Sequence, residues 1–237
     1  GRVSPAANWP QHGPVAVRVG LACVPVWADC PMLLVVVAWT LGLTAVSSVV
    51  WVLVGVAGAW SRDEAPPWLR CPVGAYVLFI RNTPFIVQLF FVFFGLPALG
   101  LRLSPEVSSV LAMVINLGAY STEIVRAGLR ATPRGQLDAA QSLALSRWQT
   151  LLHVVLPPAL QRVWPALNSQ IIIVMLGSAV CGQISTSELS YAANLIQSRN
   201  FRAFEAFIIA SAIYLLLSVL TRCLIDAVGQ LIFARGR

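Results

Sequence analysis

The sequence predicts an all-α integral membrane protein with about five transmembrane helices and a helical cytoplasmic coupling loop between the third and fourth spans. Three observations predict this fold. Of 237 residues, 58% are hydrophobic and only 11% are charged, whereas soluble domains carry about 25% charged residues. The apolar residues gather in runs long enough to cross a bilayer, which takes roughly 20 residues. The sixteen positive residues are all arginine and gather mostly between those runs.

The first two spans are expected at about 32–60 and 74–99. The stretch IRNTP interrupts the second span. Arg81 is expected near one interface, because a charge in hydrocarbon costs several kcal/mol. Pro84 lacks a backbone donor and should kink the helix. Arg81, Thr83 and Pro84 are therefore interpreted as a structural motif that holds a kink at the cytoplasmic side of this span.

The third span begins with a clear start signal. Ser104 suits an N-cap, Pro105 the first helical position, and Glu106 the positive end of the helix dipole. The helix should continue through STEIVRAGL. The last three spans are expected at about 107–120, 166–184 and 207–220.

Arginine counting sets the expected orientation. Ten arginines fall in the loops on one side of the spans and five on the other. Positive residues favour the cytoplasm, so the 126–162 loop and the C-terminus should lie inside and the N-terminus outside. Residues 1–31 are expected to form an extracytoplasmic tail and not a cleavable signal peptide. Residues 32–237 then form the transmembrane domain, with the coupling loop at about 127–163.

The coupling loop contains GQLDAAQSLALSRWQTLLHVVLPPAL, residues 135–160, which predicts two amphipathic helices and a turn near 144–146. Thr132 is expected to cap the first helix, with Pro133 at its first position. Ser146 and Gln149 have capping-box spacing, in which each side chain satisfies the other residue's backbone amide.

The second helix of the loop is expected to end at Pro157 and Pro158. Each helix has an apolar stripe at helical spacing. The residues of the two stripes are Leu137, Ala140 and Ala144, then Trp148, Leu151, Leu152 and Val155. The pattern fits a loop that docks a cytoplasmic partner and equally a helix pair that packs only on its own protein.

The composition excludes several functions. A Walker A loop needs a lysine, and the chain has none. Five cysteines without a CxxC pair and two distant histidines predict neither a metal site nor an enzyme's catalytic cluster. A Cys23–Cys30 disulfide stays open, with free thiols the commoner case. The arginine surplus indicates topology and not nucleic-acid binding.

Several segments, in order, resemble a known family. DAAQSLALSRWQTLLHVVLP resembles the EAA loop of ATP-binding-cassette (ABC) importer permeases. WTLGL, RNTPFIVQLFFVFFGLP, AYSTEIVRAGL and SRNFRAFEAF resemble stretches of the polar amino acid uptake permeases of the histidine and glutamine type. The resemblance covers about 39–222, most of the chain.

The resemblance implies a permease subunit that moves a polar amino acid through a bacterial inner membrane. It implies an ABC ATPase subunit that uses the ATP, a second permease chain (identical or paralogous) and an extracytoplasmic solute-binding protein. The chain itself would bind no cofactor. The implied ATPase-coupling residues are Gly135, Asp138, Ala139, Ala140, Ala144, Ser146 and Arg147.

The sequence departs from the family at three places. Asp138 replaces the usual glutamate, and Ala144 replaces a usual glycine, which strains the backbone if that position has positive φ. Leu176 stands where relatives often carry a lysine. The docking assignment predicts that Ala139→Arg or Ala140→Arg breaks ATP-coupled uptake while the chain still inserts.

Polar residues within the later spans are candidates for a substrate pathway. They are Asn116, Tyr120, Gln170 and Ser178. For any single one of these residues, a hydrogen bond between helices is the commoner role in membrane bundles. Glu123 and Arg126 are expected to form an ion pair. The alternative function is an ion-coupled secondary transporter, which would need a carboxylate near the middle of the membrane.

Overall fold

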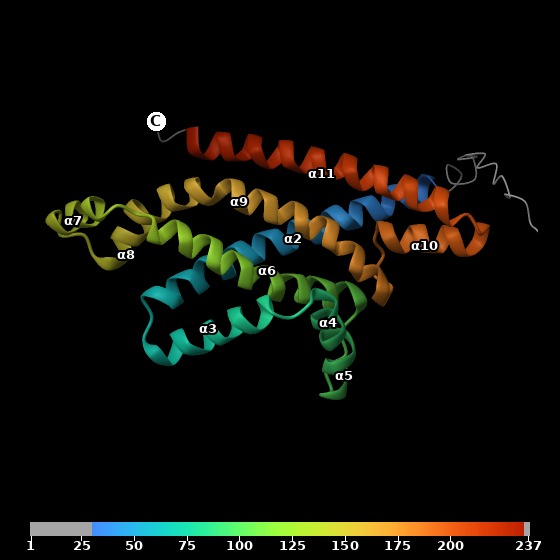
Figure 1. The fold of residues 1–237 in the computed structure, drawn as a ribbon, viewed down its shortest axis with the longest axis horizontal. Helices are drawn as coiled ribbons and strands as arrows, with labels where there is room; N and C mark the ends of the chain where they lie inside the picture. The colour runs from blue at the N-terminus through green and yellow to red at the C-terminus, as the bar shows by residue number, and fades with distance from the viewer. Residues whose placement is uncertain (1–29, 235–237) are drawn as a thin grey trace, which may run out of the picture.

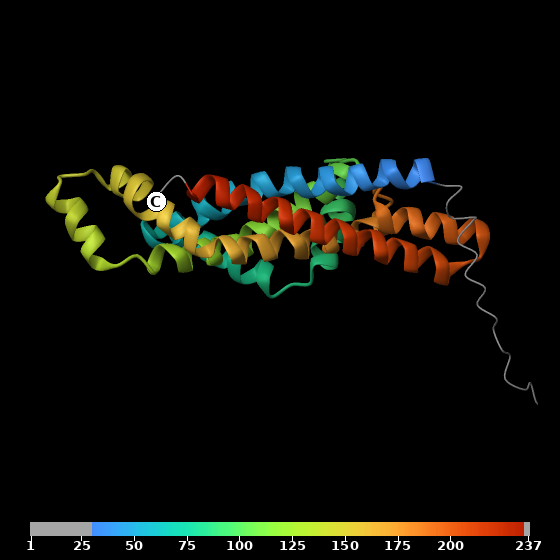
Figure 2. The same cartoon turned by 90° about the horizontal axis from the view of Figure 1, so that it is seen from above.

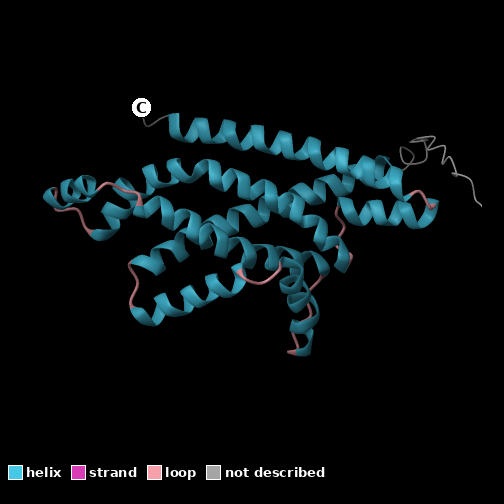
Figure 3. Ribbon diagram, in the orientation of Figure 1, coloured by secondary structure: helices cyan, strands magenta, loops and turns pink. Residues whose placement is uncertain are grey.

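The computed structural model describes residues 30–234, and the regular structure in that range is helical throughout (Figures 1 and 3). Four helices are long and apolar enough to cross a membrane: Pro31–Asp63, Pro105–Arg130, Arg147–Ile184 and Ala203–Leu231. A bent pair, Pro67–Arg81 with Phe85–Ala98, makes a fifth span if it is counted as one. The predicted fold class of about five spans is therefore confirmed.

The chain forms the following elements in order. The first half holds α2 (Cys30–Asp63), α3 (Pro67–Arg81), α4 (Phe85–Phe90), a π-helical turn η1 (Phe91–Gly95), α5 (Leu96–Ala98) and α6 (Pro105–Arg130). The second half holds α7 (Arg134–Ser142), α8 (Arg147–Gln149), a π-helical turn η2 (Thr150–Val155), α9 (Leu156–Gly177), a 3₁₀ turn η3 (Ser178–Ile184), α10 (Leu189–Asn200) and α11 (Ala203–Ala234). The candidate Cys23–Cys30 disulfide and residues 1–29 of the predicted tail lie outside the part of the chain whose side chains the structure describes.

The centre of the bundle is the packing of α2 against α6. Trp51 is fully buried there, and the Ser121 hydroxyl donates a hydrogen bond to the Trp51 carbonyl at 3.1 Å. A Cβ atom added at Gly55 or Gly58 would collide with the side chain of Ser121 or Thr122. Small residues let helix backbones approach closely in membranes, so the two glycines set the distance between these helices.

The second span is broken where the sequence predicts. α3 and α4 meet at 112°, and Figure 1 shows α4 and α5 leaving the long axis of the bundle. The Thr83 hydroxyl donates to the Phe79 carbonyl at 2.8 Å and closes the last turn of α3. Arg81 is the last residue of α3 and is exposed, about 20 Å along the helix axis from Pro67; its place near a membrane interface stays a prediction.

α7 and α8 project from one end of the bundle, which we call the elbow end, and α10 lies at the opposite end (Figure 2). Two predictions about the elbow helices are wrong. The first helix begins at Arg134 with no side-chain cap, and Pro133 precedes it, so Thr132 does not cap it. Pro157 and Pro158 lie inside one continuous helix, Arg147–Ile184. They follow the π-helical turn η2, where an irregular hydrogen-bond ladder accommodates two residues without N–H groups.

The opposite end is built around a buried carboxylate. Glu188 is fully buried and caps α10, accepting hydrogen bonds from the backbone N–H groups of Ser190 at 2.9 Å and Tyr191 at 2.7 Å. The Tyr214 hydroxyl on α11 donates to the same carboxylate at 2.5 Å. Burial raises the pKa of Glu188 above its usual value, and these three donors oppose that shift. The carboxylate thereby ties α10 to α11.

Candidate functional site

The turn between α7 and α8 is a Schellman motif. The Leu145 N–H bonds to the Ala140 carbonyl at 3.1 Å, and the Ala144 N–H bonds to the Gln141 carbonyl at 2.9 Å. This pair of hydrogen bonds needs a residue in the left-handed conformation just after the end of the helix. Ala144 is that residue, with φ 53°. The alanine therefore sits where glycine is usual, and the predicted strain is present.

The helix after the turn starts as the sequence predicts. The Gln149 N–H donates to the Ser146 hydroxyl at 3.4 Å, and the Ser146 N–H donates to the Gln149 side-chain oxygen at 2.9 Å. Trp148 then stacks on Trp60 of α2, with ring centroids 5.1 Å apart. This aromatic contact joins the elbow to the first span, and the sequence analysis did not identify Trp60.

α7 has two different faces. Ala140 is only 2% exposed, and its neighbours Leu137 and Gln141 line a cavity of about 660 Å³ between the elbow and the bundle. The outward face carries small or short side chains that are all exposed: Gly135, Asp138, Ala139 and Ser142. At the tip, Leu143 is 73% exposed. Ala140 therefore differs from the other candidate coupling residues of α7, because a partner docked on the outward face would not touch it.

Replacing Ala144 with glycine is expected to stabilise the turn. A left-handed alanine costs about 1–2 kcal/mol, and glycine's extra chain entropy returns about half of that. The net gain of about 0.5–1 kcal/mol should slow hydrogen exchange of the Leu145 amide roughly two- to fivefold. Ala139→Gly, at an ordinary helical position, should destabilise α7 and speed hydrogen exchange of the same amide. Faster exchange in Ala144→Gly would contradict the assignment of strain.

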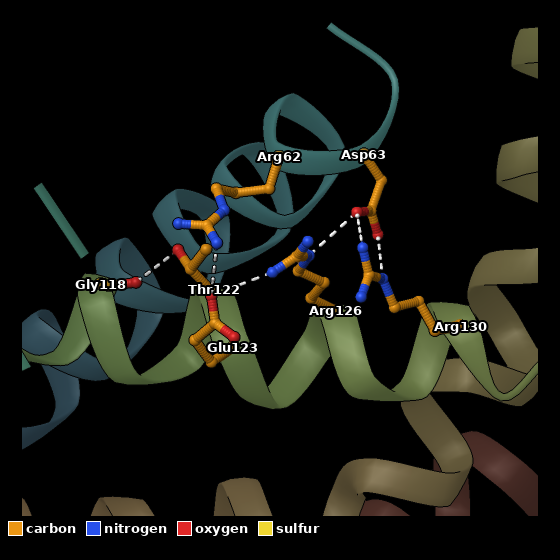
Figure 4. Close-up of polar contacts among 7 residues, drawn as sticks. All are labelled: Arg62, Asp63, Gly118, Thr122, Glu123, Arg126 and Arg130. Carbon is orange, nitrogen blue, oxygen red and sulfur yellow. Dashed lines mark hydrogen bonds and ion pairs between the residues drawn. The ribbon is translucent and has the colours of Figure 1, made fainter. Parts of the chain in front are cut away.

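An ion-pair network joins the elbow ends of α2 and α6 (Figure 4). Asp63 accepts from the Arg126 Nε at 2.9 Å and from two nitrogens of Arg130 at 2.8 and 3.1 Å. Glu123 lies 3.5 Å from Arg126 and 3.6 Å from Arg62. The expected Glu123–Arg126 pair is therefore present. The network extends from it to Arg130 of α6 and to Arg62 and Asp63 of α2.

The candidate pathway residues do not form one cluster. Asn116 and Gln170 both line a cavity of about 100 Å³ between α6 and α9. Tyr120 lies one turn from Asn116 on α6 and lines a different, larger cavity. Ser178 is fully buried and donates to the Met175 carbonyl at 2.7 Å, so its hydroxyl serves its own helix.

Gln88 is a polar residue that the sequence analysis missed. Its side-chain nitrogen donates to the carbonyls of Ile80 at 2.8 Å and Thr83 at 2.9 Å, next to the break at Pro84. Its side-chain oxygen accepts from Asn116 at 3.0 Å. Gln88 thus donates to two carbonyls at the break and joins the break to α6 through Asn116. The signal was a single amide within the apolar run FIVQLFFVFF.

The larger cavity, of about 400 Å³, lies between α2, α3 and α6. We call it the arginine cavity. Its polar lining consists of Arg62, Arg81, Asn82, Tyr120 and Glu123. The Arg81 guanidinium lies 5.5 Å from the centre of the Tyr120 ring, a cation–π distance. Two cations, a carboxylate, an amide and a phenol thus line one cavity, at which Arg81 and Asn82 are exposed.

Comparison with known proteins identifies relatives across most of the chain. Residues 52–233 match the family described as "Binding-protein-dependent transport system inner membrane component". A probable amino-acid ABC transporter permease of Sinorhizobium fredii is 32% identical, covering 87% of this chain and 89% of the relative. The glutamine transport system permease of Escherichia coli is 31% identical, covering 82% of this chain and 90% of the relative. A probable glutamine ABC transporter permease of Bacillus subtilis is 35% identical, covering 70% and 77%.

Solved structures show the same architecture. A crystal structure of an amino acid ABC transporter with histidines superposes with a TM-score of 0.79 at 30% identity, covering 87% of this chain and 97% of that one. An inward-facing structure of the MetNI methionine ABC transporter reaches 0.72 at 20% identity, covering 86% and 98%. The second similarity concerns the fold alone.

Proposed function

Since this chain belongs to the family of binding-protein-dependent transport system inner membrane components, we propose that the solute it carries is a polar amino acid. The chain is a multi-pass membrane permease subunit, with helices that suit a bilayer. The substrate class rests on relatives that are themselves named as amino-acid and glutamine permeases. The family assignment favours a binding-protein-dependent importer over an ion-coupled secondary transporter.

We infer that a separate ABC ATPase supplies the driving force. The observation that carries this proposal is the projecting elbow, whose outward face is made of small exposed residues on α7. Such a face lets another protein's groove approach the helix backbone closely. The absence of lysine from the sequence, and with it of a Walker A loop, points the same way. In this arrangement ATP binds only to the partner, and the chain is not an enzyme.

The elbow end then faces the cytoplasm. Loop arginines favour that orientation, with the N-terminal end outside the bacterial inner membrane and the C-terminal end inside. A second permease chain, identical or paralogous, completes the pathway, and an extracytoplasmic binding protein delivers the solute at the α10 end. Rigid-body rocking of the helices converts ATPase closure into alternating access.

The pathway itself is proposed to follow one face of α6. Asn116, Tyr120 and Glu123 are spaced four and three residues apart, so they share that face. Asn116 and Gln170 line the small cavity, and Tyr120 and Glu123 line the arginine cavity nearer the elbow. A polar solute would pass from the first to the second without contacting lipid.

Reconstitution tests this function. The chain is placed in proteoliposomes with an ABC ATPase and an extracytoplasmic binding protein from the same genome, and the binding protein is loaded with each of the twenty L-amino acids in turn. Uptake of at least one polar amino acid is expected only when ATP and both partners are present. Accumulation against a gradient by the chain alone would overturn the proposal, and so would a complex that imports none of the twenty.

A further inference from the structure

Two indole rings join the elbow to the first span. Trp60 lies in the last turn of α2, and Trp148 lies in α8, at the start of the helix that follows the elbow turn. Their ring centroids are 5.1 Å apart and their planes differ by 27°, which is a stacked arrangement. Both rings line the cavity of about 660 Å³ between the elbow and the bundle. Aromatic pairs attract each other beyond the burial of their area, so the stack holds the elbow to α2 beside this cavity.

In the described part of the chain, neither an ion pair nor a side-chain hydrogen bond joins α7 or α8 to α2, α3 or α6. The hydrogen bonds between Ser146 and Gln149 stay within the segment. Contact between the elbow and α2 is therefore made by packing. Trp60 and Trp148 are the largest side chains that line the cavity between them.

The backbone connects the elbow to the bundle at two points, and both contain a segment that can bend. On one side, α6 ends at Arg130 and residues 131–133 form a turn outside any helix. On the other side, α8 continues through the π-helical turn η2, and Pro157 and Pro158 follow without N–H groups to donate. Helices bend where their hydrogen-bond ladder is irregular. A force on the elbow would therefore turn it about these two points unless a further contact held it.

The stack is such a contact, and it lies on a firmly held part of the bundle. Asp63 follows Trp60 by three residues on α2. It accepts hydrogen bonds from Arg126 at 2.9 Å and from Arg130 at 2.8 Å, so the elbow ends of α2 and α6 are fastened to each other (Figure 4). Further along α2, Gly55 lets the two helix backbones approach closely. A displacement of Trp60 therefore moves α2 and α6 together.

We propose that the Trp60–Trp148 stack transmits the ATP-driven movement of the elbow to α2, which makes Trp60 a positioning residue for transport. The inference rests on the function proposed above and adds the contact through which movement enters the first span. α2 then carries the movement toward the opposite end of the bundle. There the Leu189 N–H of α10 donates to the Thr40 hydroxyl of α2 at 3.3 Å. One helix thus joins the elbow end to the α10 end.

The experiment measures how many solute molecules are imported for each ATP hydrolysed, in proteoliposomes with the complete permease–ATPase complex and the loaded binding protein. The solute is the L-amino acid that the wild-type complex imports fastest. The variants are Trp60→Leu, Trp148→Leu, the double variant and Trp60→Phe. Leucine keeps an apolar side chain that cannot stack, whereas phenylalanine can still stack. Trp68→Leu is the matched control, because Trp68 is 75% exposed in the first turn of α3 and does not line the elbow cavity.

Trp60→Leu should lower the solute imported per ATP about fivefold, an effect of the size that one aromatic pair supports. The ATPase still docks on the outward face of α7 and hydrolyses ATP, but α2 follows its movement less. A merely structural loss would reduce uptake and hydrolysis together and leave this ratio unchanged. Trp60→Phe should keep the ratio within about twofold of wild type, and Trp68→Leu should not change it. The double variant should resemble Trp60→Leu, because both changes remove the same contact.

Two results would overturn this inference while leaving the proposed function intact. One is a Trp60→Leu complex whose ratio of solute to ATP equals that of the wild type, whether or not both rates fall. The other is a double variant in which the two single effects multiply, since independent effects would mean that the rings do not act through their mutual contact. A wild-type complex that imports none of the twenty amino acids would overturn the function and this inference together.

Discussion

Ala139→Arg is expected to abolish ATP-driven uptake while the chain still inserts and folds. Ala139 is exposed on the outward face of α7, beside Gly135, where an added Cβ would meet nothing within the chain. The new side chain therefore disturbs no internal contact. In a close helix-in-groove interface it would collide with the partner. We expect uptake to fall about 30-fold or more, the effect of losing an interface hot spot.

The matched control for this variant is Gln141→Arg. Gln141 is exposed on the same helix, but it is two residues after Ala139 and lines the cavity between the elbow and the bundle, so it lies on another side of the helix. Uptake should stay within about threefold of wild type. Binding of the purified ATPase should follow the same order in a pull-down from membranes. Ala140→Arg gives a less clear result than the sequence suggested, because Ala140 is buried and its replacement would unfold the elbow as well. Full uptake by Ala139→Arg would remove α7 from the docking surface.

Gly58→Leu is expected to prevent the bundle from folding. A Cβ at this position would meet the Thr122 side chain, including its Cγ2 at 3.1 Å and its Cβ at 3.3 Å. Thr122 is fully buried, and its hydroxyl is held by the Gly118 carbonyl at 2.7 Å, so it has nowhere to move. Overpacking typically costs about 1–3 kcal/mol, and forcing two membrane helices apart over several turns should exceed that range.

Fluorescence-detected size-exclusion chromatography after heating measures this loss. Gly58→Leu should give aggregated protein or a strongly lowered melting temperature. Gly42→Leu is the control, because Gly42 lies on the same helix and has nothing within 4 Å of an added Cβ. It should melt like the wild type. If Gly58→Leu also melted like the wild type, the close approach of α2 and α6 would not describe the folded protein.

Local patterns predicted much of the elbow. The capping box follows from the local spacing of Ser146 and Gln149, whereas the strain at Ala144 was expected from the family resemblance; both are present. The two errors arose where a local rule met a context it does not include. Proline ends a regular α-helix, yet Pro157 and Pro158 follow a π-helical turn and the helix continues. Thr132 suits an N-cap by residue type, yet Pro133 takes the N-cap position and the helix begins at Arg134.

For the candidate pathway residues, the sequence predicted little of the arrangement that the structure shows. The sequence identified Asn116 and Tyr120 as polar residues one turn apart, but it did not show that they line different cavities or that Asn116 bonds to Gln88. Those relationships join residues far apart along the chain, and single-sequence patterns carry no information about such distances. The roles of the candidate coupling and pathway residues remain predictions.

The sequence by itself determined that this chain crosses a membrane about five times, that its second span breaks at Pro84 and that two helices, the second with a capping box, lie between the third and fourth spans. Hydrophobic run length and backbone hydrogen bonding are local, so they can be read from consecutive residues. Only the tertiary structure decided that the exposed Arg81 side chain lies over the Tyr120 ring, and that Asp63 of α2 pairs with Arg126 and Arg130 of α6. Those facts depend on how α2, α3 and α6 pack, and packing brings together charges that the chain separates by up to 67 residues.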